Sequence, residues 1–275
     1  MADNLLDKAS ILLTPTAYDN GSMLSVKPEN GDGDFTFSRG SAATRVNAQG
    51  LVEEITDTDL PRIDYTDGCG SWLLEPQSTN LITYSEDFSQ WSNGESVVVA
   101  NQLTSPSGEM TASKINALNA TNQQYINLNS TVSSGSEYTF SCFAKKGEID
   151  YIALVGLNPF TVSYFDLDNG TVLHNTATSS SIEDFGNGWY KCTSTFDADT
   201  TTKFSGIYLS YDGVSITNGT NISNGEGVYI WGAQLEQQSY ATSYIPTNGA
   251  TNTRLQEIGR ASCRERVENT VVAVA

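Results

Sequence analysis

The chain has 275 residues, which is enough for one large domain or two ordinary domains with buried cores. It carries 14 basic and 32 acidic residues, and the formal net charge of -18 argues against any nucleic-acid partner, because phosphates would be repelled. A hydrophobic content of 38% with 10% aromatic residues excludes a disordered chain, and no apolar run is long enough to cross a bilayer, so no membrane insertion is expected.

Residues 1–83 are rich in turns and carry strand-like runs that are less regular than those further along the chain. The opening run MADNLLDKASILL has acidic residues before a short apolar stretch and no basic segment. It does not resemble a secretory signal, so we expect synthesis in a cytoplasm. The runs DFTFSRGSAATRVNAQGLVEEI and LPRIDYTDG predict short strands. We interpret residues 1–83 as a β-rich N-terminal module, with a boundary near residue 83 where the composition changes.

Residues 84–247 contain many short runs in which apolar and polar residues alternate. Examples are YTFSCFAKK, WYKCTSTF and VYIWGAQLEQ, which are rich in β-branched and aromatic residues. Asn-Gly pairs separate such runs, and Asn169-Gly170 predicts a hairpin because this dipeptide favours tight turns. The absence of helical periodicity and of tandem repeats favours a two-sheet β-sandwich. The sequence therefore predicts an all-β protein, a sandwich preceded by a smaller irregular β-rich module.

The residues that usually carry catalysis are sparse. His174 is the only histidine and follows the predicted hairpin, so we interpret it as an exposed residue at a strand end. No nucleophile elbow and no phosphate-binding loop occurs. The run DLDNG begins like a calcium loop, but Ala177 stands where the bidentate glutamate belongs. We predict no enzymatic activity, no metal site and no cofactor. Carboxylates are abundant, so a glycosidase pair stays open.

The four cysteines are Cys69, Cys142, Cys192 and Cys263, and they lie far apart in the sequence. None has a neighbouring histidine or a second cysteine two residues away, which argues against zinc-ribbon and thioredoxin sites. Cys142 and Cys192 lie inside predicted strands. We expect both to be buried free thiols, since free cysteine is among the most buried residue types.

Three long blocks carry a resemblance to phage virion proteins of the tail-fibre or head-spike type. They are GDFTFSRGSAATRVNAQGLVEE, PRIDYTDGCGSWLLEPQSTNLITYSEDFSQW and VYIWGAQLEQQSYATSYIPTNGATNTR, and the resemblance covers most of residues 5–255. Residues 84–247 are also similar in layout to jelly-roll carbohydrate-binding modules. In such modules acidic residues often hold calcium at the closing strand, where this chain has Ile230-Trp231-Gly232, so calcium binding stays open.

The resemblance implies a virion structural protein whose jelly-roll binds a host-surface glycan without cleaving it. It further implies a location in the virion, contacts with other virion proteins, and a homo-oligomer, often a trimer. The N-terminal module would serve as virion attachment or as a linker. Three other functions stay open: a glycan-degrading tail enzyme, a bacterial surface adhesin, and a purely architectural capsid or tail decoration protein.

A sugar-binding site needs exposed aromatic rings beside amide or carboxylate groups, because sugars present apolar C–H faces together with hydroxyls. Alternation along a strand buries half of the aromatic residues, so each candidate also has an interpretation as a core residue. The candidate glycan ligands are Tyr151, Asn158, Phe160, Tyr164, Tyr211 and Trp231.

Residues 248–275 are predicted to be an unstructured tail. The run EIGRASCRERV, residues 257–267, is basic in an otherwise acidic protein. Back-translated with ordinary codons, it resembles a common short-read sequencing adapter. We therefore interpret residues 257–275 as adapter-derived, and we expect Arg260, Arg264 and Arg266 to have only incidental acidic partners.

Overall fold

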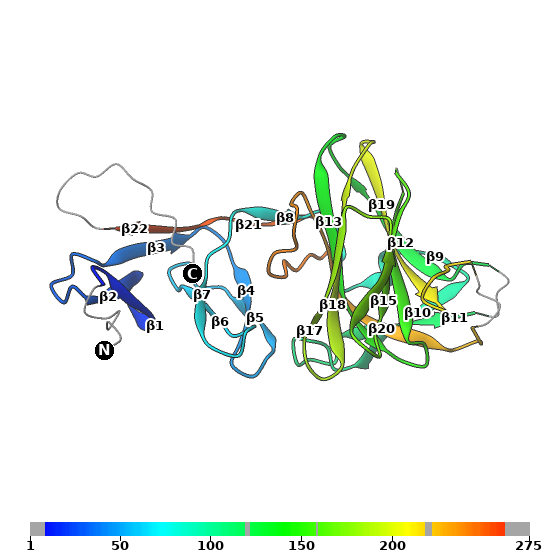
Figure 1. Ribbon diagram of the computed structural model, residues 1–275, viewed down its shortest axis with the longest axis horizontal. Helices are drawn as coiled ribbons and strands as arrows, with labels where there is room; N and C mark the ends of the chain where they lie inside the picture. Colours follow the sequence, from blue (N-terminus) through cyan, green and yellow to red (C-terminus); the bar gives the residue numbers. More distant parts are fainter. Residues whose placement is uncertain (1–8, 119–121, 158, 218–221, 262–275) are drawn as a thin grey trace, which may run out of the picture. The chain divides into compact units, whose positions relative to one another are not determined.

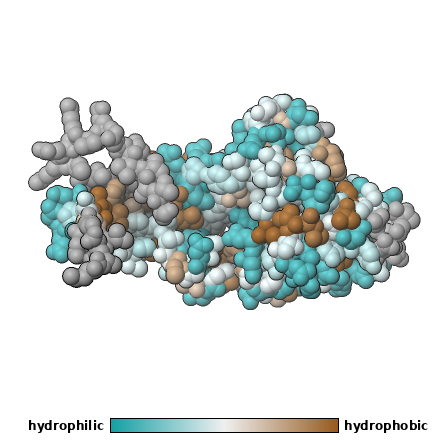
Figure 2. Space-filling model, viewed as in Figure 1, coloured by the Kyte–Doolittle hydropathy of each residue, from teal (hydrophilic) through white to brown (hydrophobic). Residues whose placement is uncertain are grey.

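The computed structural model describes residues 9–118, 122–157, 159–217 and 222–261 (Figure 1). Within these residues, every regular element except the 3₁₀ turn η1 (Phe88–Gln90) is a β-strand, which confirms the all-β prediction. No described helix is long and apolar enough to cross a membrane. The surface is mainly hydrophilic with separate hydrophobic patches, as the charge composition leads one to expect (Figure 2).

The chain forms two units whose boundaries differ from the predicted ones. The first unit comprises residues 1–77 together with 254–275, and the second comprises residues 78–253. The predicted boundaries near residues 83 and 247 are therefore displaced by about six residues each. The larger difference is that the chain returns to the first unit after the sandwich is complete. No local change in composition predicts this return.

In its described residues, the first unit contains three small antiparallel sheets. The four-stranded sheet has the order β1-β2-β3-β22. The strands of this unit are β1 (Leu12–Asp19), β2 (Ser22–Lys27), β3 (Phe35–Arg39), β4 (Ala43–Val46), β5 (Val52–Ile55), β6 (Arg62–Asp64), β7 (Ser71–Leu73) and β22 (Glu257–Ala261). β4 pairs with β5, and β6 pairs with β7.

The expected unstructured tail is wrong for the residues up to 261. Asn248 forms a β-bridge with Tyr84, β21 (Asn252–Arg254) pairs with β8 (Ser78–Asn80), and β22 pairs with β3 in antiparallel register. The edge of β3 offers backbone groups that pair with an extended segment, and β22 occupies this edge. Residues 262–275, with Cys263, Arg264 and Arg266, lie outside the described residues, and their adapter origin stays a prediction.

The first unit contains buried ion pairs between side chains as well as a small apolar cluster. Met23, Phe35 and Phe37 form that cluster. Next to β22, the Glu257 carboxylate accepts hydrogen bonds from Arg39 Nη1 at 3.1 Å and from Arg62 Nε at 2.7 Å, with all three side chains fully buried. Glu75 pairs with Arg62 and with Arg254, each at 2.9 Å. Glu257 therefore lies among buried guanidinium groups, contrary to the expectation that residues 248–275 form an unstructured tail.

The second unit consists mainly of two six-stranded antiparallel sheets, named here after a central strand of each. The β13 sheet has the order β10-β11-β20-β13-β18-β17, and the β14 sheet has the order β16-β15-β14-β19-β12-β9. Their strands are β9 (Ser92–Gly94), β10 (Ser96–Leu103), β11 (Ala112–Ala117), β12 (Tyr125–Thr131), β13 (Glu137–Lys146), β14 (Tyr151–Leu157), β15 (Thr161–Asp166), β16 (Thr171–Asn175), β17 (Ser179–Asp184), β18 (Trp189–Asp197), β19 (Thr202–Ser210) and β20 (Gly227–Glu236).

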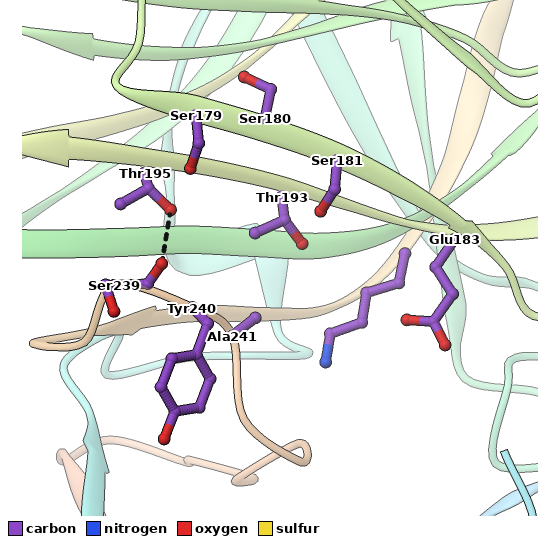
Figure 3. A pocket seen from close by; sticks show the side chains of 10 residues that line it. Ser179, Ser180, Ser181, Glu183, Thr193, Thr195, Ser239, Tyr240 and Ala241 are labelled. Atoms are coloured by element: carbon purple, nitrogen blue, oxygen red, sulfur yellow. Dashed lines mark hydrogen bonds between the residues drawn. The ribbon is translucent and has the colours of Figure 1, made fainter.

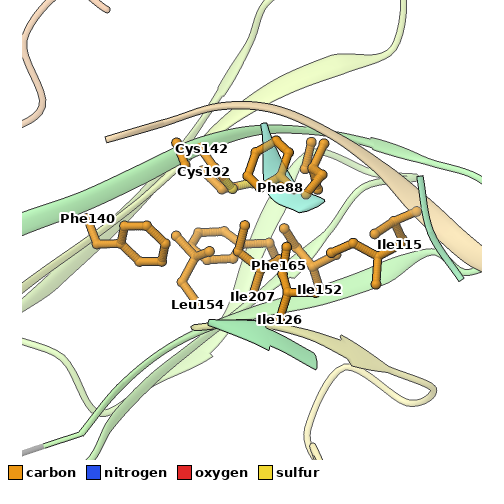
Figure 4. Close-up of a cluster of buried hydrophobic side chains, with 14 of the residues drawn as sticks. Phe88, Ile115, Ile126, Phe140, Cys142, Ile152, Leu154, Phe165, Cys192 and Ile207 are labelled. Atoms are coloured by element: carbon orange, nitrogen blue, oxygen red, sulfur yellow. The ribbon is translucent and has the colours of Figure 1, made fainter. Parts of the chain in front are cut away.

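The core of the second unit lies between these two sheets. Alternation places Ile152 and Leu154 of β14 in the large apolar cluster, while Ala153 and Val155 face the opposite side of the sheet. Figure 4 shows side chains from both sheets packing together in this cluster. The predicted sandwich is thus confirmed. Its strand sequences alternate with a period of two because every second side chain faces this core.

The predicted hairpin at Asn169-Gly170 is confirmed. β15 pairs with β16, and Asp166 lies opposite Thr171, so four residues form the connection. Gly170 adopts a positive φ of 64°. The Asp166 carboxylate accepts hydrogen bonds from the backbone N–H groups of Asp168 and Asn169, both at 2.9 Å. A side-chain acceptor therefore stabilises a turn longer than the two-residue type.

Candidate functional site

The outer face of the β14 sheet carries a group of aromatic side chains that we call the tyrosine face. It is defined by Tyr125, Tyr164, Phe204 and Tyr208, which lie with small apolar residues on the side of the sheet opposite the core. Tyr125 and Tyr208 stand opposite each other on β12 and β19. Their rings are stacked, with centroids 4.5 Å apart and planes 13° apart.

Gly206 makes room for these rings. It lies between Phe204 and Tyr208 on β19, and a Cβ at this position would be 2.6 Å and 2.7 Å from atoms of the two rings. Phe204 and Tyr125 have ring centroids 6.3 Å apart. The glycine thus allows three aromatic rings to lie against one another on a single sheet face.

The tyrosine face borders a hollow of about 470 Å³, here called the tyrosine hollow, which Gly94, Glu95, Asn122, Gln123, Tyr125 and Thr217 line. Tyr125 is half-buried, while Glu95 and Asn122 are exposed. Asn122 Nδ2 donates a hydrogen bond to Glu95 Oε1 at 2.8 Å, which orients both groups. A Cβ on Gly94 would stand 2.2 Å from the Tyr125 ring, so this ring lies directly on backbone. The hollow combines a fixed ring with amide and carboxylate groups.

Four of the six predicted glycan ligands belong to strands of the β14 sheet or to segments that adjoin them. Alternation puts Tyr151 and Tyr164 on the outer side of β14 and β15. Tyr164 is only 4% exposed, and burial together with the charge of Asp212 raises its pKa. Phe160, at 56% exposure, lies between β14 and β15, and Tyr211, at 55% exposure, directly follows β19. None of the four lines the tyrosine hollow.

Trp231 does not fit its predicted role, because it is a buried residue of the other sheet. It is 2% exposed and packs against Phe143 and Tyr244, with ring centroids 5.4 Å and 4.6 Å away. Its Nε1 donates a hydrogen bond to Glu86 at 3.1 Å. The core interpretation therefore holds for Trp231. Asn158 lies outside the described residues.

Glu86 is the acidic residue that contacts Trp231 of β20, the strand at which the sequence left calcium binding open. Its carboxylate accepts hydrogen bonds from Trp231 Nε1 and, at 2.9 Å, from the Tyr244 hydroxyl. Burial and the charge of Glu86 raise the pKa of Tyr244, so this hydroxyl stays a donor. In the part of the chain that the structure describes, no three His, Cys, Asp or Glu residues gather in a way that could hold a metal ion.

A second hollow lies on the outer face of the β13 sheet, and we call it the serine groove (Figure 3). It measures about 240 Å³, and hydroxyl side chains of β17 and β18 form its floor. Tyr240 lines it from the segment after β20, with 49% exposure. Lys191 Nζ donates to the backbone oxygen of Thr242 at 2.9 Å, which ties that segment to the sheet. The groove offers one half-exposed ring and no stacked pair of tyrosines.

The residues of the tyrosine hollow were missed at the sequence level. The signal was present in QQYINLN, where Tyr125, Asn127 and Asn129 follow one another at a spacing of two and so share one strand face. What the pattern could not show is that Tyr208, far along the chain, would stack on Tyr125. That contact needs the pairing of β12 with β19.

Comparison with known proteins gives only distant likenesses. No protein-family model and no curated protein matches the chain. A Clostridium thermocellum xylanase 10B structure comprising CBM22-1 and GH10 modules with xylohexaose aligns at 13% identity and a TM-score of 0.33, over 62% of this chain and 30% of that one. The enzymatically active domain of Bacteriophage CBA120 tailspike protein 4 aligns at 11% identity and a TM-score of 0.31, over 57% and 21%.

A third structure comes from work on the promiscuous specificity of carbohydrate-binding modules of the β-sandwich superfamily. It aligns at 14% identity and a TM-score of 0.36, over 82% of this chain and 97% of that one. The chain thus spans less than a third of the xylanase and of the tailspike domain. At these scores the likenesses carry no argument about function, which rests on the site itself.

Proposed function

We propose that the second unit binds a glycan at the tyrosine hollow and holds it without cleaving it. The observation that carries this proposal is the half-buried Tyr125 ring, stacked on Tyr208 and flanked by Asn122 and Glu95. An aromatic ring packs against the C–H face of a pyranose, an adjacent amide donates hydrogen bonds to its hydroxyls, and an adjacent carboxylate accepts hydrogen bonds from them. Both requirements meet in one hollow.

The preformed geometry favours binding. Tyr208 supports the Tyr125 ring from one side, and the Gly94 backbone limits it further, so little rotamer freedom is lost when a sugar binds. Among the described residues that line the hollow, Glu95 is the charged one and none is basic. A neutral sugar therefore suits the site better than a phosphorylated or sulfated one.

The proposed setting is the surface of a phage particle, where this chain would act as a tail-fibre or head-spike component. This part of the proposal rests on the three sequence blocks that resemble such virion proteins. The first unit would attach to other virion proteins, and the chain would form a homo-oligomer, with a trimer as the expected state. Each site of this shallow kind binds with about millimolar to micromolar affinity, and several sites together bind more tightly.

The proposal is tested with the full chain on an array of neutral polysaccharides, followed by calorimetry with the best oligosaccharide. Tyr125→Ala should weaken binding by about tenfold or more, because the stacking ring is lost. Tyr240→Ala is the matched control, since it removes the half-exposed tyrosine of the serine groove and should leave affinity unchanged. An unchanged affinity in Tyr125→Ala would overturn the proposed site, and a loss in Tyr240→Ala would move it to the serine groove.

Binding without cleavage is tested separately from binding. The polysaccharide that binds best is incubated with the protein, and its chain length is measured by size-exclusion chromatography. We expect no shortening. Shortened chains would make the protein a glycan-degrading tail enzyme, and an array without any signal for an oligomeric sample would favour an architectural decoration protein.

The virion setting is tested by identifying the genes that surround the gene for this protein and by native mass spectrometry. Neighbouring genes for capsid or tail proteins and a trimeric mass support the proposal. Neighbouring genes for cell-surface export would favour a bacterial adhesin.

A further inference from the structure

Cys142 and Cys192 lie directly opposite each other in the core of the second unit. The register of β13 and β18 pairs these two residues, and the ladder runs without interruption on both sides of them. Both side chains point into the large apolar cluster with no exposed surface. Figure 4 shows them side by side at the edge of that cluster. Both are free thiols in this structure.

Directly opposed residues of an antiparallel ladder have Cα atoms about 4.5 to 5.5 Å apart. This spacing lies within the range of about 4.4 to 6.8 Å that a disulfide bridges. Both side chains leave the sheet on the same face, so their spacing and direction are compatible with a bond between the two sulfur atoms. The backbone therefore already has the arrangement that a disulfide requires.

We propose that Cys142 and Cys192 are the site of a cross-strand disulfide, which forms when the chain folds or opens in the presence of a small disulfide oxidant such as glutathione disulfide. The thiolate of one cysteine attacks a sulfur of glutathione disulfide and releases one glutathione thiolate, which leaves a mixed disulfide on the protein. The second cysteine, as thiolate, attacks the protein sulfur of that mixed disulfide and releases the second glutathione. Two protein thiols are oxidised, one glutathione disulfide is reduced, and the two protons pass to the released thiolates or to water.

The folded sandwich protects both thiols from this reaction. Burial raises the pKa of Cys142 to about 12, so its reactive thiolate is scarce at neutral pH. Cys192 has a raised pKa for the same reason, with the neighbouring Cys142 as a further cause. β17, the edge strand of the β13 sheet, pairs with β18 at Cys192. Oxidation therefore needs the chain to be unfolded or this edge to be open, and a protein folded in a reducing cytoplasm keeps its thiols.

The experiment uses the full chain with Cys69→Ser and Cys263→Ser, because Cys69 is exposed and would compete for the oxidant. The protein is reduced, unfolded in urea and refolded in a mixture of glutathione and glutathione disulfide. Intact mass after alkylation and peptide mapping then report the cross-link. We expect a mass lower by two hydrogen atoms, a linked peptide pair containing Cys142 and Cys192, and a melting temperature several degrees higher, because the link closes a loop of about 50 residues.

Two controls define the mechanism. The same protein kept folded in the same mixture should remain reduced over the same time, since the thiols are buried. Cys142→Ala in this background should give no link, with Cys192 either free or bound to glutathione. The proposal is overturned if the refolded protein has both thiols open to alkylation after unfolding, or if each carries its own glutathione.

Discussion

The two units of this protein bury different kinds of side chain. The sandwich of residues 78–253 is held by an apolar cluster to which both sheets contribute. The first unit has an apolar cluster of three buried residues and, beside it, the ion pairs of Arg39 and Arg62 with Glu257. The stabilisation from an apolar core is spread over many weak contacts. A buried ion pair depends on one charge, because its removal leaves the partner charge buried without compensation. The units should therefore fail for different reasons.

The largest effect is expected in the apolar core. Phe165→Ala removes a fully buried ring of β15 and should lower the free energy of unfolding of the sandwich by about 3 to 5 kcal/mol. Calorimetry that resolves the transitions of the two units measures this change. The transition of the first unit should stay in place, and a shift of both transitions by the same amount would show that the units unfold together.

Glu257→Gln should act on the first unit alone and cost about 3 kcal/mol, because two buried guanidinium groups lose their shared carboxylate. This expected cost lies at the low end of the range for breaking a buried ion pair, since Glu75 still pairs with Arg62. Deleting residues 257–275 should also destabilise the first unit, and the sandwich should keep its melting temperature. Glu53→Gln is the control, because the pair of Glu53 with Arg45 is partly exposed and is worth about 1 kcal/mol or less. Equal effects of Glu257→Gln and Glu53→Gln would contradict the ionic account.

A smaller effect is expected from Lys203, a cation inside the sandwich. Its side chain is buried, and its Nζ lies 3.9 Å from the centre of the Phe196 ring. Burial lowers its pKa from 10.5 to about 8. As the pH rises through 8, the folded state loses this proton, whereas the unfolded state keeps it until the pH nears 10.5. The unfolded state then binds more protons, and the free energy of unfolding rises with pH.

The clearest window for this test is pH 7 to 8. From about pH 8.5 the buried thiols act in the opposite sense, because their pKa is raised in the folded state and only the unfolded chain releases their protons. Urea unfolding of the sandwich should show a positive slope in this window, and Lys203→Met should flatten it. A slope that is the same in both proteins would assign the titration to another group.

Much of the sandwich could be predicted because its information is local. Alternating residues in runs such as 138–146 and 189–196 require strands, and the Asn169-Gly170 turn places β16 beside β15. The burial of Cys142 and Cys192 and the exposure of His174 followed from the same reasoning and are confirmed. Trp231 was misplaced because alternation identifies two faces of a strand without saying which one a neighbouring segment covers.

The sequence by itself determined the fold class, since periodicity and turn residues act over a few neighbouring positions. Only the tertiary structure decided which residues meet. Tyr125 stacks on Tyr208 because β12 pairs with β19, and Glu257 reaches Arg39 because β22 returns to the edge of β3. Such contacts join residues separated by tens to hundreds of positions, and their energies depend on burial that no local pattern encodes.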